Sequence, residues 1–449
     1  MSWSKVSEQR YERPLGENET FIKLLGDAAR PFNRDHWAMN IIVSVTPLGS
    51  LAQENQASLF REAWKALRFR HPTIAAYIVD ETQYVYDIPD IAALENWATE
   101  TFRVVEDKTI DEVIASATCV PYSTMTYFPK TGELLGHSQH WRTDGVGGLI
   151  LIDDLLDLTV QGALDTSALP WGEEVVRLAP SVEEAASSFI ISEEPDKKLG
   201  QELVATFGHT AGAIGIVSPA PVGTMPGSAC IRRLHLTEEE TNVVLQGCKD
   251  RNLSVTAAAH ASIAGTNYTF AASEDQKKHY TSTIRYSLRP FLPEPYSGRQ
   301  CASTIFTTGW MFPVSSDSSW LDRAKAYHGE YRKGISHAYI SAHREYATGL
   351  CSLLRSLPED MPSPTDVDIS SLGLCERLIA REKGTAERGF CIDRISGGLD
   401  MMNRQVVCHV WTFRDQLCLN LAFNDAFYSR EEADSFLQTV KDSLLYELK

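Results

Sequence analysis

The sequence predicts an α+β protein built from two lobes, on three observations. The chain has 449 residues, whereas a single hydrophobic core stops growing at about 250 to 300 residues. Strand-like and helix-like patterns mix through both halves, and the regular βαβ rhythm of a doubly wound sheet is missing. We therefore expect an N-terminal lobe at 1–175, a linker at 176–227 and a C-terminal lobe at 228–449.

In the first half, runs of β-branched and apolar residues predict strands, and apolar residues at helical spacing predict helices. A Ser or Thr followed three residues later by Glu or Gln marks a helix start as a capping box. These rules predict, in order, a strand at 39–45, a helix opened by Ser50 and Gln53, strands at 74–79 and 84–86, a short helix capped by Thr109 and Glu112, a hairpin of strands at 122–128 and 133–140, and a helix at 146–158.

The second half follows a segment rich in Pro and Gly at 219–228, which we interpret as the passage between the lobes. The same rules predict a helix capped by Thr237 and Glu240, a helix from Ser254, strands around Ile284 and Ile305, a hairpin of strands at 407–413 and 417–423 with its turn at Arg414 and Asp415, and a closing helix capped by Ser429 and Glu432.

The charge balance argues against several classes of partner. The chain has 42 Lys and Arg against 59 Asp and Glu, a net charge of -17, and no basic block. Nucleic acid and anionic membrane surfaces are therefore not expected as partners. We find neither a run of roughly 20 apolar residues that would form a membrane helix nor the apolar core of a signal peptide. Nine cysteines without metal-like spacing indicate free thiols. We expect a cytoplasmic monomer.

The segment 136–148, GHSQHWRTDGVGG, carries the strongest chemical signal. It places His140, Asp144 and Gly145 at a strand end just before a helix, where catalytic groups reach a cleft. A histidine acts as a general base near neutral pH because its ordinary pKa is about 6.5. Asp144 either orients the imidazole or holds the turn, and Gly145 allows a positive φ and a close backbone approach.

Other chemistries fit this segment poorly. Side chains alternate along a strand, so His137 and His140 point to opposite faces, and we expect no metal site. Ser138 lies in a sequence that resembles a hydrolase nucleophile elbow, but the bulky His140 replaces the last Gly of that motif. The segment therefore indicates a base without a nucleophile.

His140, Asp144 and Gly145 match the active-site motif of the HxxxD acyltransferase superfamily, which includes chloramphenicol acetyltransferase, the plant BAHD enzymes and the condensation domains of peptide synthetases. Within it the chain most resembles the trichothecene 15-O-acetyltransferase-like enzymes of fungal secondary metabolism. That resemblance covers most of the chain and also rests on LTEEE at 236–240, SVTA at 254–257, SLRP at 287–290, TGW at 308–310, SSLG at 370–373 and NDAFY at 424–428. The DFGWG motif of the plant enzymes is missing, and Gln139 replaces the first His of the condensation domains.

The resemblance implies two chloramphenicol acetyltransferase-like lobes, each a mixed, mostly antiparallel sheet with helices, and an active-site channel between them. It implies acetyl-CoA or another acyl-CoA as co-substrate, no tightly bound cofactor, and a hydrophobic alcohol of secondary metabolism as acceptor. His140 is then the catalytic base. Asp144 forms a structural pair with Arg289, beside Gly145, and Arg285 is the rival partner.

Three further residues are candidates for substrate contact, each with a plainer alternative. Ser371, or its neighbour Ser370, donates to the oxyanion or caps a turn or helix. Trp310 lines an acceptor pocket or fills the core, and Trp141 faces the channel. The same fold also carries cyclases, pericyclases and condensation-type enzymes that act without CoA. Those reactions, and a catalytically inactive binding protein, are the alternatives to an O-acetyltransferase.

Overall fold

The computed structural model describes residues 2–162, 164–187, 192–358 and 364–449. The chain divides into two compact units, each assembled from separate stretches of sequence. The first unit comprises Met1–Glu193, Ser287–Phe306 and Glu376–Ser396, and the second comprises Glu194–Tyr286, Thr307–Cys375 and Gly397–Lys449. Arg289 therefore belongs to the same unit as the HxxxDG segment. The linker predicted at 176–227 includes 188–191, which lie outside the described residues.

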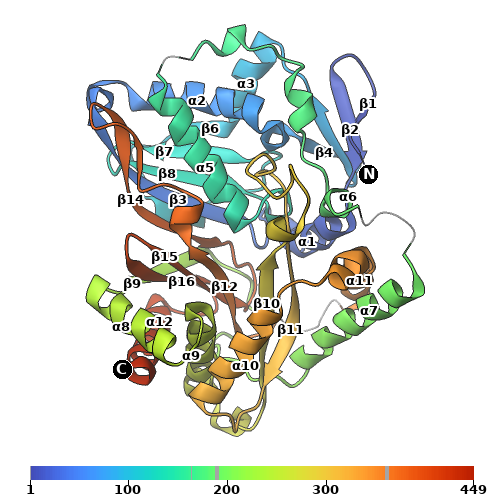
Figure 1. The fold of residues 1–449 in the computed structure, drawn as a ribbon, viewed down its shortest axis with the longest axis vertical. Helices are drawn as coiled ribbons and strands as arrows, with labels where there is room; N and C mark the ends of the chain where they lie inside the picture. The colour runs from blue at the N-terminus through green and yellow to red at the C-terminus, as the bar shows by residue number, and fades with distance from the viewer. Residues whose placement is uncertain (1, 163, 188–191, 359–363) are drawn as a thin grey trace. The chain divides into compact units, whose positions relative to one another are not determined.

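The first unit contains a six-stranded and a four-stranded sheet (Figure 1). The six-stranded sheet has the order β13-β14-β3-β8-β7-β6, formed by β3 (Met39–Gly49), β6 (Phe102–Val104), β7 (Thr124–Phe128), β8 (Glu133–Ser138), β13 (Glu382–Gly384) and β14 (Arg388–Leu399). The smaller sheet has the order β1-β2-β5-β4, formed by β1 (Ser4–Lys5), β2 (Arg10–Pro14), β4 (Tyr77–Val79) and β5 (Gln83–Asp87). Strand β8 pairs antiparallel with both β3 and β7, whereas β6 joins β7 in parallel.

Helix α5 (Gly145–Val160) lies against the six-stranded sheet beside α2 (Gln56–Arg70) (Figure 1). It buries Leu149, Ile152 and Leu155 to 1% exposure or less, which is typical of a helix that is covered on several sides. Because α5 begins directly after Asp144, its packing fixes the position of the HxxxDG segment. The first unit also contains α1 (Glu17–Asp27), α3 (Ile91–Thr101), α4 (Ile110–Ala115) and α6 (Val182–Ala185).

The second unit is built on a four-stranded sheet and a two-stranded ribbon. The sheet has the order β12-β15-β16-β9, formed by β9 (Ala229–His235), β12 (Val367–Leu374), β15 (Val406–Phe413) and β16 (Gln416–Asn424), and the ribbon pairs β10 (Tyr280–Ser287) with β11 (Thr307–Val314). Its helices include α7 (Glu194–Ala205), α8 (Glu238–Asp250), α9 (Val255–Phe270), α10 (Trp320–Lys333), α11 (His337–Ser356) and α12 (Arg430–Leu448). Helices α9 and α12 pack together and against the sheet, whose β12 and β15 run parallel.

The predicted α+β class is confirmed, and four local predictions are wrong. The strand predicted at 133–140 ends at Ser138, because the chain turns there into a 3-10 helix that contains His140. Ser50 and Gln53 form a short 3-10 helix, and the α-helix begins at Gln56 because Asn55 caps it through the amide of Ser58. The strand predicted at 74–79 is confined to Tyr77–Val79, because a 3-10 helix that starts at Pro72 covers its first residues. Ile305 lies before β11 and not within a strand.

Candidate active site

His140 lies on a short 3-10 helix, His140–Arg142, between the end of β8 and the start of α5. Its ring is half-buried, and Nδ1 lies 3.1 Å from the backbone oxygen of Thr143. A carbonyl oxygen only accepts a hydrogen bond, so the neutral imidazole carries its proton on Nδ1 and its lone pair on Nε2. The turn thus favours the tautomer that a general base acting through Nε2 requires.

The turn before β3 brings a second aromatic ring to His140. Met39 lies opposite Ser138 in the antiparallel pair β3 and β8, and Trp37 and His140 lie in the turns just beyond these two strand ends. The two ring centroids are 6.2 Å apart, with the rings tilted by 51°. Trp37 is half-buried and has a φ of +64°. Trp37 is not predicted as a site residue, because its proximity to His140 depends on which strands pair and on how the chain turns beyond them.

His137 is the neighbouring histidine, and it has a different environment. It lies opposite Asn40 in the β3–β8 pair, and its Nδ1 is 2.9 Å from Oδ1 of Asn40. His137 lies within β8, whereas His140 lies on the 3-10 helix that follows the end of this strand. Among the described residues, neither histidine belongs to a cluster of metal-ligating side chains.

Gln139 connects two buried charged groups beside His140. Its Nε2 donates to Oδ1 of Asp35 at 3.1 Å, and its Oε1 accepts from Nε of Arg142 at 2.8 Å. The side-chain amide of Gln139 thus donates to the carboxylate of Asp35 and accepts from the guanidinium of Arg142, and it links the two groups. The residues before and after His140 are therefore held by one buried network.

Arg142 and Trp141 anchor the same turn in the interior of the first unit. Arg142 donates to the backbone oxygens of Ala76 and Pro121, each at 2.6 Å, and burial lowers the pKa of its guanidinium. This guanidinium lies 4.2 Å from the ring centroid of Trp141, whose other neighbour is the edge-on ring of Tyr84. Trp141 is only 3% exposed, so the structure places it in a packed cluster.

Asp144 is fully buried at the N-terminus of α5. Its Oδ1 accepts from the amide of Gly147 at 2.8 Å, and its Oδ2 accepts from the amide of Phe306 at 2.9 Å. Nη1 of Arg289 donates to both carboxylate oxygens, at 2.7 and 2.6 Å. The carboxylate therefore caps α5 and ties the segment Ser287–Phe306 to it, and its hydrogen bonds go to groups other than His140.

The two arginines that the resemblance offered as partners of Asp144 have separate environments. Arg289 is 4% exposed, and its Nη2 donates to the backbone oxygens of Cys301 and Thr304. Arg285 belongs to the second unit and pairs instead with Asp368, at 2.7 Å. Arg289 thus has the contacts of a structural partner of the motif aspartate.

The glycine run that follows Asp144 permits a close backbone approach. Gly145 is the first residue of α5, and it is not among the described glycines with positive φ, contrary to the conformation expected for it. A Cβ atom at Gly147 would lie 2.0 Å from the backbone oxygen of Ala302. The close approach expected at Gly145 therefore falls two residues later, where segment 287–306 crosses the helix start.

The other two predicted site residues lie in the second unit. Trp310 lies on β11, is half-buried, stacks on Tyr286 at 5.1 Å between ring centroids, and donates from Nε1 to Glu330 at 2.9 Å. Ser371 lies on β12, next to a register shift in its pairing with β15, and its Oγ is 2.9 Å from Oγ1 of Thr256. Ser371 is therefore a strand residue and does not cap a helix or turn.

Ser138, Cys301 and Cys408 have environments that do not activate a nucleophile. Oγ of Ser138 is 2.9 Å from Oγ of Ser123 and 3.3 Å from the backbone oxygen of Gln139, so its contacts include no base. None of the nine cysteines forms a disulfide. Burial raises the pKa of Cys301 to about 11 and that of Cys408 to about 12, which leaves these thiols protonated at neutral pH.

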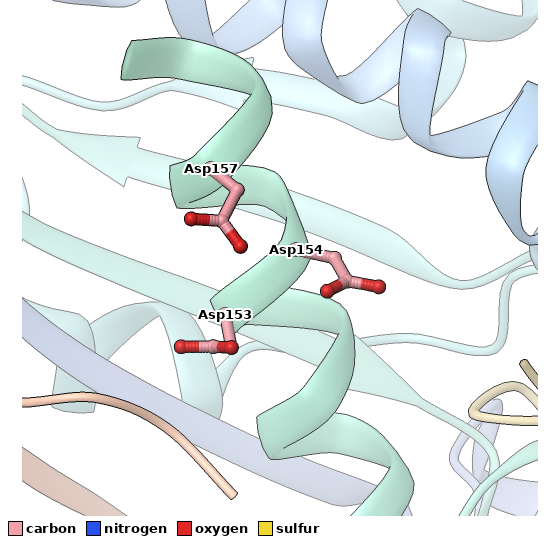
Figure 2. Close-up of side chains that lie close together, drawn as sticks. All are labelled: Asp153, Asp154 and Asp157. Carbon is pink, nitrogen blue, oxygen red and sulfur yellow. The ribbon is translucent and has the colours of Figure 1, made fainter. Parts of the chain in front are cut away.

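A cluster of three carboxylates on α5 has the composition of a metal site. Asp153 and Asp154 are adjacent on the helix and Asp157 lies about one turn later (Figure 2), and each offers a carboxylate oxygen within 4.8 Å of the others. Basic side chains already contact all three: Arg299 contacts Asp153 and Asp154 at 2.6 and 2.9 Å, Lys383 contacts Asp153 and Asp157 at 2.8 and 3.0 Å, and His71 contacts Asp154 at 2.7 Å. These ion pairs join α5 to the segments 287–306 and 376–396 of the first unit, so the three acids have a structural role.

The fold matches that of a known acyltransferase. Trichothecene 15-O-acetyltransferase TRI3 of Fusarium sporotrichioides superimposes with a TM-score of 0.82 over 99% of this chain and 97% of that one, at 18% identity. No family model matches the sequence. The expected chloramphenicol acetyltransferase-like fold is confirmed.

Comparison with related sequences shows the family to which the chain belongs. The chain is 39% identical to the acetyltransferase pigO of Monascus ruber, over 100% of this chain and 98% of that protein. It is 30% identical to the O-acetyltransferase pigM of the same fungus, over 100% of this chain and 87% of that protein. The chain therefore belongs to the family of these fungal acetyltransferases. In the part of the chain that the structure describes, every helix is too short or too polar to cross a bilayer.

Proposed function

We propose that this acyltransferase transfers the acetyl group of acetyl-CoA to a hydroxyl of a hydrophobic secondary metabolite. The name O-acetyltransferase of the relative pigM supports an oxygen acceptor, and the acetyltransferase pigO supports the two-carbon acyl group. The observation that carries the proposal is the turn at His140, where a half-buried imidazole has Nδ1 directed at a backbone oxygen.

His140 is the general base in this proposal. Its Nε2 removes the hydroxyl proton as the acceptor oxygen bonds to the thioester carbonyl carbon, which gives a tetrahedral intermediate. When that intermediate collapses, the carbon–sulfur bond breaks and the proton passes from the imidazolium to the departing thiolate. The products are an acetate ester and CoA, and the enzyme needs no covalent intermediate.

The remaining roles at the site divide between reactivity and architecture. Asp144 and Arg289 hold the start of α5, so both act on the reaction through the position of His140, and Gly145 is the first residue of that helix. For Trp141, Trp310 and Ser371, contact with substrate stays a prediction. We also propose that the enzyme works as a cytoplasmic monomer.

Direct transfer predicts a specific kinetic pattern. A mass-spectrometric screen of hydroxylated polyketides and terpenoids with acetyl-CoA identifies an acceptor, and initial rates are then measured while both substrates vary. Intersecting lines, with no acetylated enzyme in intact-protein mass spectra after incubation with acetyl-CoA alone, support a ternary complex. Parallel lines with a stable adduct contradict direct transfer. Product that forms equally well without acetyl-CoA points instead to a cyclase.

A further inference from the structure

Trp37 adopts a backbone conformation that large side chains rarely adopt. Its φ is +64°, in the left-handed region that is expensive for residues with a Cβ atom. Among the described residues, the other non-glycine positions with positive φ all carry polar side chains: Asn33, Asp80, Glu81, Ser187, Asn252, Arg414 and Asp415. Glycine or asparagine would fit position 37 better by backbone preference alone.

The surrounding turn holds Trp37 in this conformation. Asp35 is fixed by Gln139, and the amide of His36 donates to the backbone oxygen of Gly26 at 3.0 Å. After the turn, Met39 enters β3 opposite Ser138. Strained residues of this kind persist where the neighbouring structure determines them, and they cluster at functional sites.

The strained turn presents an aromatic face next to the candidate base. Asp35 and His36 are buried. Trp37, which follows them in the turn before β3, is half-buried. The Trp37 ring lies 6.2 Å from that of His140 and also contacts His36, at 5.6 Å between centroids. An indole face beside a proton-accepting group contacts the part of a substrate that surrounds the reacting hydroxyl.

We propose that Trp37 binds the acceptor alcohol by packing its indole against a flat, unsaturated ring that carries the hydroxyl. This inference rests on the proposed function, because it assumes that His140 receives a proton from that hydroxyl. Aromatic rings favour stacked or edge-to-face contact with other unsaturated rings. Trp37 therefore selects conjugated acceptors over saturated ones of the same size.

Two model alcohols test this selection without turnover. Isothermal titration gives the Kd of 2-naphthylmethanol and of its fully saturated decahydro analogue for the wild-type protein, Trp37→Gly and Trp37→Phe. We expect the wild type and Trp37→Phe to bind the naphthyl alcohol about tenfold more tightly than the saturated one. Trp37→Gly should lose this preference while its Tm stays equal to or above that of the wild type, because glycine tolerates the positive φ.

The matched control is Trp171→Phe, which alters a half-buried tryptophan of the same unit whose Nε1 donates to the backbone of Thr166. This variant should keep the naphthyl preference. A Trp37→Gly protein that retains the preference, or a wild type that has none, overturns the inference. A Tm drop without loss of preference assigns Trp37 to folding. None of these readouts requires acetyl-CoA, so failure of the proposed acetyl transfer is detected separately by the kinetic experiment above.

Discussion

The two ends of the HxxxD segment have opposite environments, although only three residues separate them. At one end, the His140 ring is half-buried beside a strained tryptophan, and Nδ1 lies near the backbone oxygen of Thr143. At the other end, Asp144 is completely buried and both of its oxygens accept hydrogen bonds from Arg289 and from backbone amides.

This difference separates reactivity from architecture within one motif. A group that exchanges protons with a substrate must be reached by it, and its lone pair must be available in the resting tautomer. A carboxylate whose oxygens are satisfied by an arginine and two amides is poorly suited to proton transfer, because protonation would break those contacts. The environment of His140 is thus suited to proton transfer, whereas that of Asp144 is suited to holding α5 against segment 287–306.

The largest expected effect is the loss of the buried pair. Asp144→Ala leaves the Arg289 guanidinium buried without its partner, which destabilises a protein by about 3 to 5 kcal/mol. Arg289→Ala should destabilise by a similar amount, and both variants should lose activity. Urea unfolding of the two single variants and the double variant measures the coupling between the residues.

Arg285→Ala is the control for that cycle, since Arg285 pairs with Asp368 in the second unit. Additive effects of Asp144→Ala and Arg289→Ala would mean that the ion pair does not hold the helix start. Coupling between Asp144 and Arg285 instead would reassign the partner.

The next effect in size concerns rate alone. His140→Ala should lower kcat by about a hundredfold or more, equivalent to about 2.7 kcal/mol of transition-state stabilisation, which is the scale of lost general-base catalysis. Its Tm should stay near that of the wild type because the ring is half-buried. His137→Ala removes the cross-strand contact with Asn40 and should alter kcat far less. Near-complete activity in His140→Ala would exclude the proposed mechanism.

A smaller loss of stability and activity is expected when the side chain of Gln139, which links Asp35 to Arg142 beside His140, is removed. Gln139→Ala removes the bridge between Asp35 and Arg142, and we expect a destabilisation of about 1 to 3 kcal/mol, typical of hydrogen bonds to charged groups. Activity should fall severalfold, since the turn of His140 loses one anchor. Gln139→Glu is the informative comparison: it pairs with Arg142 but repels Asp35, so recovery of stability there would show that the Asp35 contact is dispensable.

Local patterns were sufficient to predict the elements that position the motif. Capping boxes predicted at Thr109, Thr237 and Ser429 are confirmed, because such a box depends only on residues three apart. The turn at Arg414 and Asp415 is confirmed by two consecutive positive φ values. The box at Ser50 failed because Asn55 offered a better cap a few residues later.

Long-range packing could not be predicted in this way. Nothing in the sequence of segment 287–306 shows that it packs with the first unit, since that placement depends on contacts between Arg289 and a residue 145 positions earlier. The pairing with Asp144 came from a family resemblance. Trp37 could not be predicted for a related reason: its contact with His140 depends on the pairing of β3 with β8 and on the turns beyond both strand ends, which a single sequence leaves open.

The smallest expected effect concerns Asp154 and tests whether a carboxylate of α5, in addition to that of Asp144 at the helix start, stabilises the fold through its charge. Burial alone would raise the pKa of Asp154, but hydrogen bonds from His71 and Arg299 outweigh it and lower that pKa to about 2, from an ordinary value of 3.8. A carboxyl group with a depressed folded-state pKa stabilises the fold above its unfolded-state pKa. That contribution is lost as the pH falls from about 4 to about 2.

Asp154→Asn should therefore be less stable than the wild type at pH 7, by about 1 kcal/mol after allowance for partial exposure. The difference should shrink as the pH falls through this window, because the wild type then loses the same charge. Thermal unfolding of both proteins between pH 7 and pH 2.5 measures it, and Asp442→Asn, which removes an exposed carboxylate of α12, is the control. A difference in stability between the two proteins that stays constant across the whole pH range would mean that the Asp154 charge does not stabilise the fold. Of the two carboxylates compared at α5, Asp144 alone would then stabilise the fold through an ion pair.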